Sequence, residues 1–393
     1  MPSRSVMVIG AGLAGAAVAR ALAERQWEVL IIDAADGPAA RASALPVGML
    51  SPHQTRSPTP MSRLTELGVA QMRDLLPRLL PQGAGWQDTE VDNLGHAAGR
   101  WPAALVRPSA LVRAWLEEAA DRGHCQVRWS CPIHRIIRAG PRWAALDALG
   151  QAIAEADHIV IAAAWASAEL LYRSLDFDPQ TLPLRPVKGQ LSYAPSVGPP
   201  QADRPCRDNG VYIPLYEDRA APAGMPPRLW AMGSTYDRGR TDTTVEPAAH
   251  ERNLRSLQAL EPAAAEHMAR AMADGSLLGW SDIRCASLDR LPLLGTLPDL
   301  SALRRRLDDA GHRRGRVPLE DCPRLPGLHV FTALGSRGLS LAYAGAGWLA
   351  QHIDIGTMPL PPDLARAVDP ARFAWRVWRR QASPSRVPDQ AAA

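Results

Sequence analysis

Hydrophobic residues at the start of the chain form short continuous runs rather than an alternating pattern. Val6–Ile9 and Glu28–Ile32 have the apolar composition of strands that are buried on both faces, as in a parallel sheet. Between them, Leu13–Arg25 is rich in alanine and favours a helix. The same order recurs more than three hundred residues later, where Leu328–Thr332 is an apolar strand and Leu339–Ile353 continues as a helix. The pattern predicts two strand–turn–helix units.

Helical spacing and a further apolar run organise the first half of the chain. Apolar residues recur at helical intervals in Met61–Leu80, which predicts a helix packed on the core. A second helix is expected from Ser109 to about Arg122, and His158–Ala162 is another buried strand. Trp86–Trp101 is polar and has no period, so we expect an irregular excursion there. Short strands of a small β-meander are expected at Gln126–Trp129, His134–Arg138 and Arg142–Leu146.

The middle of the chain has the alternating period of antiparallel strands with one covered face. Three segments show it: Gln190–Tyr193, Val211–Leu215 and Leu229–Met232. Two helical segments and one further strand follow: Thr244–Leu260, Ala263–Ala273 and Leu277–Ile283. A sheet of this kind, lying between two nucleotide-type units, predicts a separate substrate domain.

The turn after the first strand carries a dinucleotide-binding motif. Gly10, Gly12 and Gly15 fit G-x-G-x-x-G between a strand and a helix. The glycines permit a tight turn, close approach of backbone to a pyrophosphate, and close packing of helix on strand. Asp33 ends the second strand, where a carboxylate would reach a ribose hydroxyl. A secretory signal is excluded because Gly, Arg20 and charged residues interrupt the apolar run.

A long loop and a second glycine-rich turn indicate which dinucleotide is bound. Ala34–His53 has too many Gly, Pro and Ala residues for a regular element, and a loop of this length is usually functional. Because it directly follows the nucleotide-binding unit, we expect it to wrap around a cofactor. Ala333–Gly338 opens the last long helix, whose N-terminal amides would stabilise negative charge on a ligand. Together these segments favour FAD over NAD.

Composition limits the remaining possibilities. The 393 residues are 46% hydrophobic and 21% charged, as in a globular protein, and no apolar segment is long enough for a membrane span. The five cysteines form no C-x-x-C pair, which predicts reduced thiols, a cytoplasmic location and no metal site. The formal charge is only +4.

Arginine is distributed unevenly and forms two clusters. One cluster contains Arg304–Arg306, Arg313, Arg314 and Arg316, and the other contains Arg372, Arg376, Arg379 and Arg380. Such clusters bind phosphates in many proteins. The alternative is a solvated basic face, and charge alone does not choose between the two.

Four blocks of sequence resemble the D-amino-acid-oxidase-like superfamily of FAD enzymes. They are VIGAGLAG, RASALPVGMLSPH, RPVKGQLSY, and the C-terminal pair DIRCASLDRLPLLGTLPD and GLHVFTALGSRGLSLA. The C-terminal pair is more narrowly similar to the flavin domain of the MnmC family, which modifies the wobble uridine of tRNA. Two features depart from that family. The flavin motif begins at Val6, so we expect a stand-alone oxidase without a preceding methyltransferase domain, and Ala163–Ala164 stands where relatives often have Ala-Gly.

The resemblance implies an α/β fold (α+β overall). It would contain a Rossmann-like FAD-binding domain of the glutathione-reductase/D-amino-acid-oxidase type and an inserted antiparallel-sheet substrate domain. The FAD-binding domain is expected at 1–84, 109–182 and 284–380, and the substrate-binding domain at 85–108 and 183–283. The tail 381–393 is rich in Pro, Ser and Ala and is expected to be disordered.

The resemblance also implies an activity. An MnmC-like flavin domain would oxidatively remove the carboxymethyl group from 5-carboxymethylaminomethyl-(2-thio)uridine at position 34, in the anticodon loop of tRNA. The product would be 5-aminomethyl-(2-thio)uridine, which a separate methyltransferase could then modify.

The same resemblance assigns roles to particular residues. Arg284 is expected to bind the substrate carboxylate, and Lys188 and Arg337 are further catalytic candidates. Tyr212 or Tyr236 is a candidate to close the pocket, although core packing is the alternative for each. The residues expected to bind FAD are Gly10, Ala11, Gly12, Leu13, Ala14, Gly15, Asp33, Ser43, Gly48, Met49, Gly335, Ser336, Gly338 and Leu339.

Two other functions fit parts of the sequence. An amino-acid oxidase acting on glycine, sarcosine or D-amino acids would have the same fold, flavin and arginine, but a free small-molecule substrate. A flavin-binding protein without oxidase function is the second alternative, and it fits less well because both glycine turns and Arg284 are present.

Overall fold

A six-stranded sheet forms the centre of one half of the molecule. The computed structural model describes residues 4–95 and 97–380, so the tail that was expected to be disordered lies outside the described residues. The strand order is β17-β18-β10-β1-β2-β6. Their bounds are β1 Ser5–Ile9, β2 Glu28–Ile32, β6 Cys125–Arg128, β10 His158–Ile161, β17 Leu293–Pro298 and β18 Arg324–Thr332. All neighbours pair in parallel except β17, which is antiparallel to β18.

The short apolar runs are buried because both faces of this sheet are covered. Val6 and Val8 of β1 point into a core that they share with helices α1 (Leu13–Ala23), α3 (Pro108–Asp121) and α8 (Gly338–Ile355). Met7 and Ile9 point the other way, into a core formed with α4 (Ala166–Ser174) and a small meander. The meander consists of β7 Arg135–Ala139, β8 Arg142–Leu146 and β9 Ala152–Ala156. Helix α2 (Pro60–Leu79) packs on α8.

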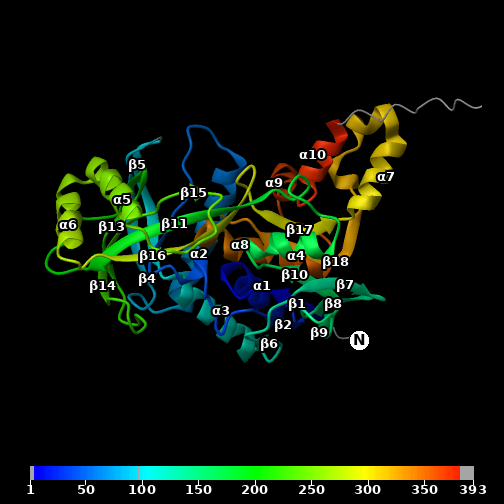
Figure 1. The fold of residues 1–393 in the computed structure, drawn as a ribbon, viewed down its shortest axis with the longest axis horizontal. Coiled ribbons are helices and arrows are strands. Elements are labelled where there is room, and N and C mark those ends of the chain that lie inside the picture. Colours follow the sequence, from blue (N-terminus) through cyan, green and yellow to red (C-terminus); the bar gives the residue numbers. More distant parts are fainter. Residues whose placement is uncertain (1–3, 96, 381–393) are drawn as a thin grey trace, which may run out of the picture.

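A larger sheet forms the other half, and it is antiparallel except where β12 pairs with β4 in parallel. Its order is β15-β11-β14-β13-β12-β4-β5-β3, and β16 pairs with β11. The bounds are β3 Gly48–Leu50, β4 Trp86–Asn93, β5 Gly99–Val106, β11 Leu184–Pro195, β12 Cys206–Asp208, β13 Gly210–Glu217, β14 Arg228–Gly233, β15 Asp237–Arg238 and β16 Leu278–Ser287. Helices α5 (Pro247–Leu260) and α6 (Pro262–Ala273) lie at the end remote from the first sheet and cover one face (Figure 1). The domain boundaries stay a prediction.

Two sequence-based expectations were wrong. Trp86–Trp101 is not irregular, because β4 and β5 form a long hairpin within the larger sheet. Within β4, Trp86 and Val91 are buried but lie five residues apart, and Asp88 and Glu90 between them are exposed, so the sequence shows no simple alternation. The segment at 126–129 does not join the meander, since β6 pairs with β2 at the edge of the parallel sheet, and β9 supplies the third meander strand instead.

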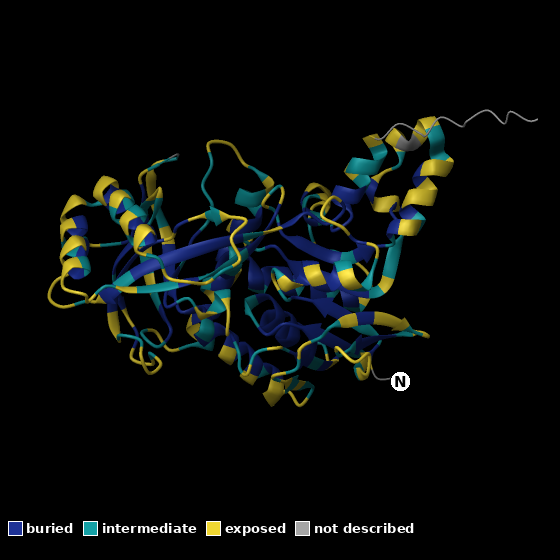
Figure 2. Cartoon of the chain, in the orientation of Figure 1, coloured by how far each residue is buried: buried dark blue, intermediate teal, exposed yellow. Residues whose placement is uncertain are grey.

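Exposed residues concentrate on α5, α6 and a lobe at the opposite end, whereas the strands are largely buried (Figure 2). We call this lobe the basic lobe; it consists of α7 (Leu300–Ala310), the 3₁₀ turn Gly311–Arg316 and α10 (Arg372–Arg380), which pack on one another. No helix in the described part of the chain has both the length and the apolar composition to cross a membrane.

Candidate active site

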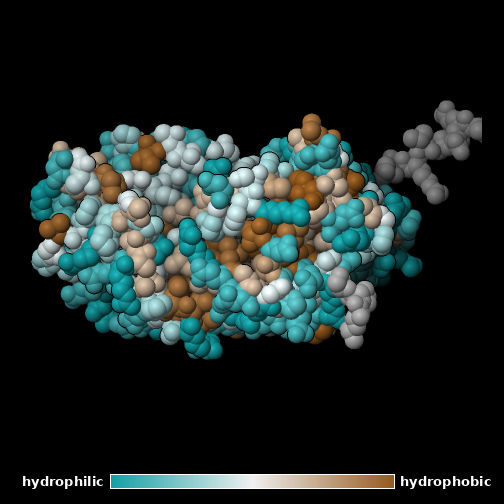
Figure 3. All heavy atoms as spheres, turned by 90° about the horizontal axis from the view of Figure 1, so that it is seen from below, coloured by the Kyte–Doolittle hydropathy of each residue, from teal (hydrophilic) through white to brown (hydrophobic). Residues whose placement is uncertain are grey.

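A cavity of about 580 Å³ lies between the two sheets. It is lined by the first glycine turn, the loop that follows β2, strands of the larger sheet, and the second glycine turn. Figure 3 shows hydrophobic residues on one face of the molecule, with the broadest group near its middle. The cavity therefore joins the two predicted nucleotide-type units, which are remote in sequence.

The first glycine turn delivers the start of α1 to the cavity. Gly10 has φ +108°, and a Cβ there would lie 2.7 Å from the Ala162 carbonyl oxygen. A Cβ on Gly15 would lie only 1.8 Å from the Gly10 carbonyl oxygen. Gly10, Ala11 and Gly15 thus shape the turn, while Gly12, Leu13 and Ala14 line the cavity.

Asp33 is placed at the end of β2 as expected, but it also has a structural contact. Its carboxylate accepts a hydrogen bond of 2.6 Å from the Ala11 amide and one of 2.8 Å from the Ala35 amide. The carboxylate therefore holds the glycine turn, and its contact with a ribose stays a prediction.

The loop after β2 folds over the cavity. Ser43 accepts a hydrogen bond of 3.1 Å from the Leu13 amide, and Ser43, Gly48 and Met49 all line the cavity. Gly48 lies against the last long helix, because a Cβ on it would be 2.8 Å from the Leu339 side chain. A short 3₁₀ turn (Ala42–Ala44) and β3 give the loop its only regular structure within the described residues.

The second glycine turn lies close to the first, since a Cβ on Gly338 would be 3.0 Å from Leu13 Cδ1. Gly335, Ser336, Arg337, Gly338 and Leu339 all line the cavity, and α8 begins there. Within the described chain, α1 and α8 both lack a side-chain cap and an acidic residue in the first turn. Two helix N-termini directed at one cavity suit a cofactor with anionic groups, since both attract negative charge. The residues present therefore fit FAD: Gly12–Ala14 would hold its pyrophosphate, and Gly335–Leu339 would hold its flavin.

Arg284 enters the cavity from β16. Its Nη1 donates to Ser234 Oγ (3.0 Å) and Ser336 Oγ (2.8 Å), and its Nη2 donates to the Thr235 carbonyl (2.6 Å). Among the described residues, no carboxylate forms an ion pair with this guanidinium, and its buried Nε has no hydrogen-bond partner. Burial lowers the pKa of Arg284 from its ordinary value, because the charged form loses hydration. Arg284 thus faces the cavity as a cation that has no ion pair with a described carboxylate, although the charge of Asp237 acts on it.

Sequence reasoning missed two further groups in the cavity. Arg337 donates from Nη2 to His53 Nδ1 (2.9 Å), and Arg207 of β12 donates to the Ser51 hydroxyl (2.6 Å) and the Pro52 carbonyl (3.1 Å). Arg207 and His53 both line the cavity. His53 ends the block RASALPVGMLSPH, but Arg207 belongs to no recognisable motif and reaches the loop from the other half of the molecule, so no local signal reveals the contact.

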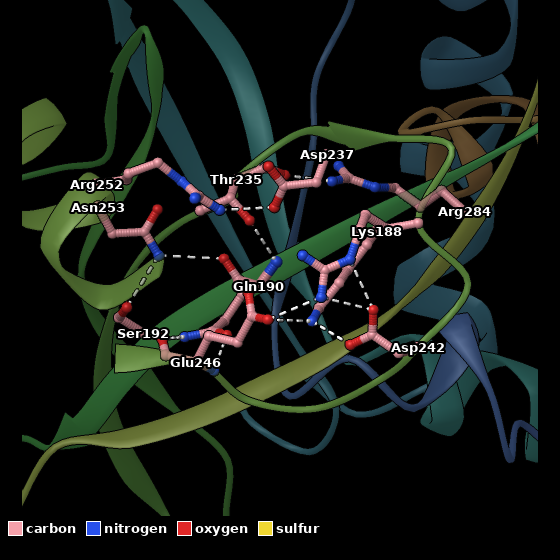
Figure 4. Close-up of polar contacts among 11 residues, drawn as sticks. Lys188, Gln190, Ser192, Thr235, Asp237, Asp242, Glu246, Arg252, Asn253 and Arg284 are labelled. Carbon is pink, nitrogen blue, oxygen red and sulfur yellow. Dashed lines mark hydrogen bonds and ion pairs between the residues drawn. The ribbon is translucent and has the colours of Figure 1, made fainter. Parts of the chain in front are cut away.

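The structure places Lys188 outside the cavity, contrary to the expectation that it is a catalytic residue. Gly189 and Leu191 of β11 line the cavity, and because side chains alternate along a strand, Lys188 and Gln190 point to the opposite face. There the Lys188 ammonium is buried and pairs with Asp242 at 2.5 Å (Figure 4). Its neighbours on that face belong to a polar network that includes Asn253 and Glu246. Lys188 therefore lies away from the cavity, and we assign it no catalytic role.

The structure places only one of the two tyrosine candidates at the cavity. Tyr212 is 2% exposed and packs in the core beneath α5 and α6. Tyr236 is 46% exposed, lines the cavity, and has its ring centroid 5.3 Å from the Arg284 guanidinium carbon. Tyr236 is therefore the one placed to cover a ligand bound at Arg284.

The two arginine clusters converge on the basic lobe, far along the molecule from α5 and α6 (Figure 1). Arg304, Arg305, Arg313, Arg316, Arg376 and Arg380 are exposed there. Arg372 is different, since it is 1% exposed and donates to both carboxylate oxygens of Asp289 (2.9 and 3.0 Å). Arg372 is thus a structural residue, whereas the six exposed arginines are available at the surface.

Comparison with known families shows to which family the chain belongs. The model of the DAO family, described as FAD dependent oxidoreductase, matches residues 5–103 and 87–352. The chain belongs to the DAO family of FAD-dependent oxidoreductases. Its cofactor is FAD, as the two glycine turns and the long loop predicted.

A curated relative narrows the resemblance. The tRNA 5-methylaminomethyl-2-thiouridine biosynthesis bifunctional protein MnmC of Ralstonia nicotianae is 33% identical over 425 residues, covering 96% of this chain and 61% of that protein. The predicted resemblance to an MnmC-like flavin domain is confirmed. The chain spans about three fifths of the length of the curated relatives it matches.

Solved structures confirm the fold. Glycine oxidase from Bacillus cereus superposes with a TM-score of 0.64 at 17% identity, covering 90% of this chain and 96% of that chain. Iminodiacetate oxidase from Chelativorans sp. gives 0.65 at 17% identity, covering 93% and 98%. The Rossmann-like FAD-binding architecture with a second antiparallel sheet is therefore the DAO fold.

Proposed function

We propose that this oxidoreductase removes the carboxymethyl group from 5-carboxymethylaminomethyl-(2-thio)uridine at wobble position 34 of tRNA and leaves 5-aminomethyl-(2-thio)uridine. The donor is a CH–NH group next to a carboxylate. The observation that carries the proposal is Arg284, a largely buried guanidinium with no described carboxylate partner, beside the glycine turn assigned to the flavin. The names of the curated relatives support a tRNA substrate, which would place the reaction in the cytoplasm.

Arg284 would bind and orient the carboxylate of the substrate. Its planar fork suits a bidentate contact with two carboxylate oxygens. A hydrogen bond to a charged group stabilises a complex by about 1.5–3 kcal/mol, and a water-excluded cavity favours the upper part of that range. Tyr236, whose ring lies against the guanidinium, would cover the bound group.

The cavity would also hold the substrate amine in its neutral form. Arg284, Arg337 and Arg207 all line it, and nearby cations lower the pKa of an ammonium group. A neutral amine is required because its lone pair must assist removal of hydride from the adjacent carbon. The cationic lining thus contributes both to carboxylate binding and to the protonation state.

Bound FAD supplies the two-electron oxidation of the CH–NH group. Oxidation of the methylene carbon next to the carboxylate would give a carbon–nitrogen double bond; the hydride would be taken up by FAD, and the amine proton would be released. Water then adds to that carbon and the carbon–nitrogen bond breaks, which yields the aminomethyl nucleoside and glyoxylate. The product is a primary amine, and an N-methylation would convert it to a methylaminomethyl group. We propose that a methyltransferase carries it out.

We further propose that the basic lobe contacts the RNA outside the cavity. Its exposed arginines are suited to phosphates, and position 34 lies in a loop of unpaired nucleotides that a cavity can accept. Binding that does not weaken with added salt would remove this part of the proposal.

A second candidate function is oxidation of a free amino acid such as glycine, sarcosine or a D-amino acid. It is favoured by the fold shared with glycine oxidase and by Arg284, which alone satisfies one carboxylate. Rapid turnover of free glycine or sarcosine together with no change in modified tRNA would favour it.

The test is nucleoside analysis of tRNA incubated with the yellow holoenzyme and with the Arg284→Ala variant. We expect the carboxymethylaminomethyl nucleoside to disappear with the native protein. The variant should bind FAD normally but show a raised KM. A variant with unchanged kinetics would remove Arg284 from the proposed site.

A further inference from the structure

We propose that Arg207 and Arg337, with His53 between them, form a second anion site in the cavity, which binds a phosphate of the nucleotide that carries the oxidised group. The inference rests on the proposed function, because it names how a nucleotide rather than a free amino acid is recognised by the same cavity. It gives Arg207 and Arg337 a ligand in addition to their effect on the substrate amine.

The cavity contains more positive charge than one carboxylate needs. Arg207, Arg284 and Arg337 all line it, and none forms an ion pair with an Asp or Glu among the described residues. Asp208 also lines the cavity, yet in the described structure it forms no ion pair. Three guanidiniums that face one space, none of them paired with a described carboxylate, indicate a ligand with more than one negative group.

Neutral acceptors hold Arg207 in a fixed position. Its Nε donates to Asn93 Oδ1 (3.0 Å), its Nη1 to Ser51 Oγ (2.6 Å) and its Nη2 to the Pro52 carbonyl (3.1 Å). A guanidinium has five N–H groups, so the second hydrogen of each Nη remains for a ligand. The fork is thus orientated by the protein while its charge is left for another partner.

His53 links the two arginines without neutralising them. Arg337 donates to its Nδ1, and Arg207 contacts the two residues immediately before it. Burial, followed by the charge of Arg337, lowers the pKa of His53 to about 4, so the imidazole is neutral at physiological pH. Burial and the same neighbour lower the pKa of Arg207 to about 10. An anion between Arg207 and Arg337 would relieve this repulsion.

The second site adjoins the first. Arg284 donates to the hydroxyl of Ser336, and Arg337 is the next residue in the chain. A ligand that places its carboxylate at Arg284 can therefore extend towards Arg337 and Arg207. Glycine and sarcosine have one carboxylate and would leave both of these charges uncompensated, whereas a phosphate suits two guanidinium forks.

The pyrophosphate of FAD does not explain the site. The glycine turn at Gly12–Ala14 is the part of the cavity suited to it, on α1. Arg207 comes from β12 of the larger sheet, on the side from which Tyr236 and Arg284 also enter. The charge of Arg207 thus belongs to the substrate side.

Calorimetry on the holoenzyme tests the site without turnover. Uridine 5′-monophosphate is compared with uridine, and we expect the phosphorylated ligand to bind at least about tenfold more tightly, as one charge-assisted bond implies. The preference should fall in Arg207→Gln and fall less in Arg207→Lys, which keeps the charge. Arg113→Gln on the exposed face of α3 is the matched control and should keep the preference. FAD content and melting temperature identify a misfolded variant, and the native comparison stands without any variant.

Kinetics then identify the source of the second anion. The ratio of kcat/KM for 5-carboxymethylaminomethyluridine 5′-monophosphate to that for its nucleoside should exceed one and fall in Arg207→Gln. Equal binding and equal kcat/KM for the two would overturn the inference, even if the nucleoside is oxidised and the proposed function stands. A preference for iminodiacetate over sarcosine, without a phosphate preference, would also overturn it, because the second anion would be a carboxylate. If neither nucleoside form is oxidised, the proposed function fails, and calorimetry alone decides the anion site.

Discussion

A methyl group added at Gly189 should disable Arg284 without changing its chemistry. Gly189 lies on β11 directly beside the guanidinium, and a Cβ there would be 1.9 Å from Arg284 Nη2 and 2.5 Å from its Cζ. The backbone of Gly189 does not have a positive φ, so alanine fits the strand itself. To reach ordinary van der Waals contact, the guanidinium must move by roughly 1.5 Å.

Such a displacement removes the contacts that orient the fork. The hydrogen bonds from Arg284 to the Thr235 carbonyl (2.6 Å) and to Ser336 Oγ (2.8 Å) cannot both be kept after a displacement of this size, because it would lengthen them beyond hydrogen-bond distance. If one charge-assisted bond to the substrate carboxylate is lost, about 1.5–3 kcal/mol of binding is lost, and KM rises by roughly 10- to 150-fold.

The assay is steady-state oxidation of 5-carboxymethylaminomethyluridine by Gly189→Ala, with flavin absorbance as the measure of cofactor content. Gly347→Ala is the matched control, because a Cβ at Gly347 meets no described atom within 4 Å. The control should keep the native KM and bind FAD. A native KM in Gly189→Ala would refute the assignment of Arg284 as the carboxylate ligand.

Three further changes test the cofactor turn, the core and the pH response. Gly15→Ala places a Cβ 1.8 Å from a backbone oxygen and should yield colourless protein without FAD, whereas Gly37→Ala, where a Cβ meets no described atom within 4 Å, should stay yellow. In the native protein Arg107 Nε lies 2.7 Å from Asp218 Oδ2. Asp218→Ala leaves this buried guanidinium without its carboxylate and should lower the free energy of unfolding by ~3–5 kcal/mol in denaturant titrations. Because burial and nearby arginines lower the pKa of His53 from 6.5 to about 4, the unfolded chain takes up this proton first, so stability should fall as pH drops from 6.5 to 4. His53→Gln should show a smaller fall over the same range in thermal melts, and an equal fall would contradict the role of this imidazole.

Local patterns predicted the FAD-binding half well. β1, the glycine turn and β2 are consecutive, so each depends on nearby residues, and the short continuous apolar runs reflect a sheet covered on both faces. The hairpin at β4 and β5 escaped prediction because its exposed face is highly charged. Its strands are specified by pairing with each other and with a distant strand, β12, rather than by a local period.

The candidate site was predicted only in part, for the same reason. Arg284 and the second glycine turn lie in blocks that resemble a family, and the structure brings them together at Ser336. Lys188 lies in such a block too, but the alternation of β11 turns it towards Asp242. Arg207 and His53 meet only through folding, since 154 positions separate them in the sequence. An arginine that lacks an ion-pair partner can be recognised only from the structure, because the sequence does not show which residues surround its side chain.

Anaerobic reduction of the flavin in a single turnover tests the central claim most directly. The holoenzyme is mixed with tRNA that carries 5-carboxymethylaminomethyl-2-thiouridine at position 34, with the same tRNA lacking that modification, or with sarcosine at equal concentration. We expect bleaching of the oxidised flavin with the modified tRNA alone, accompanied by equimolar glyoxylate and aminomethyl nucleoside. Bleaching by sarcosine, with modified tRNA left unchanged, would contradict the account.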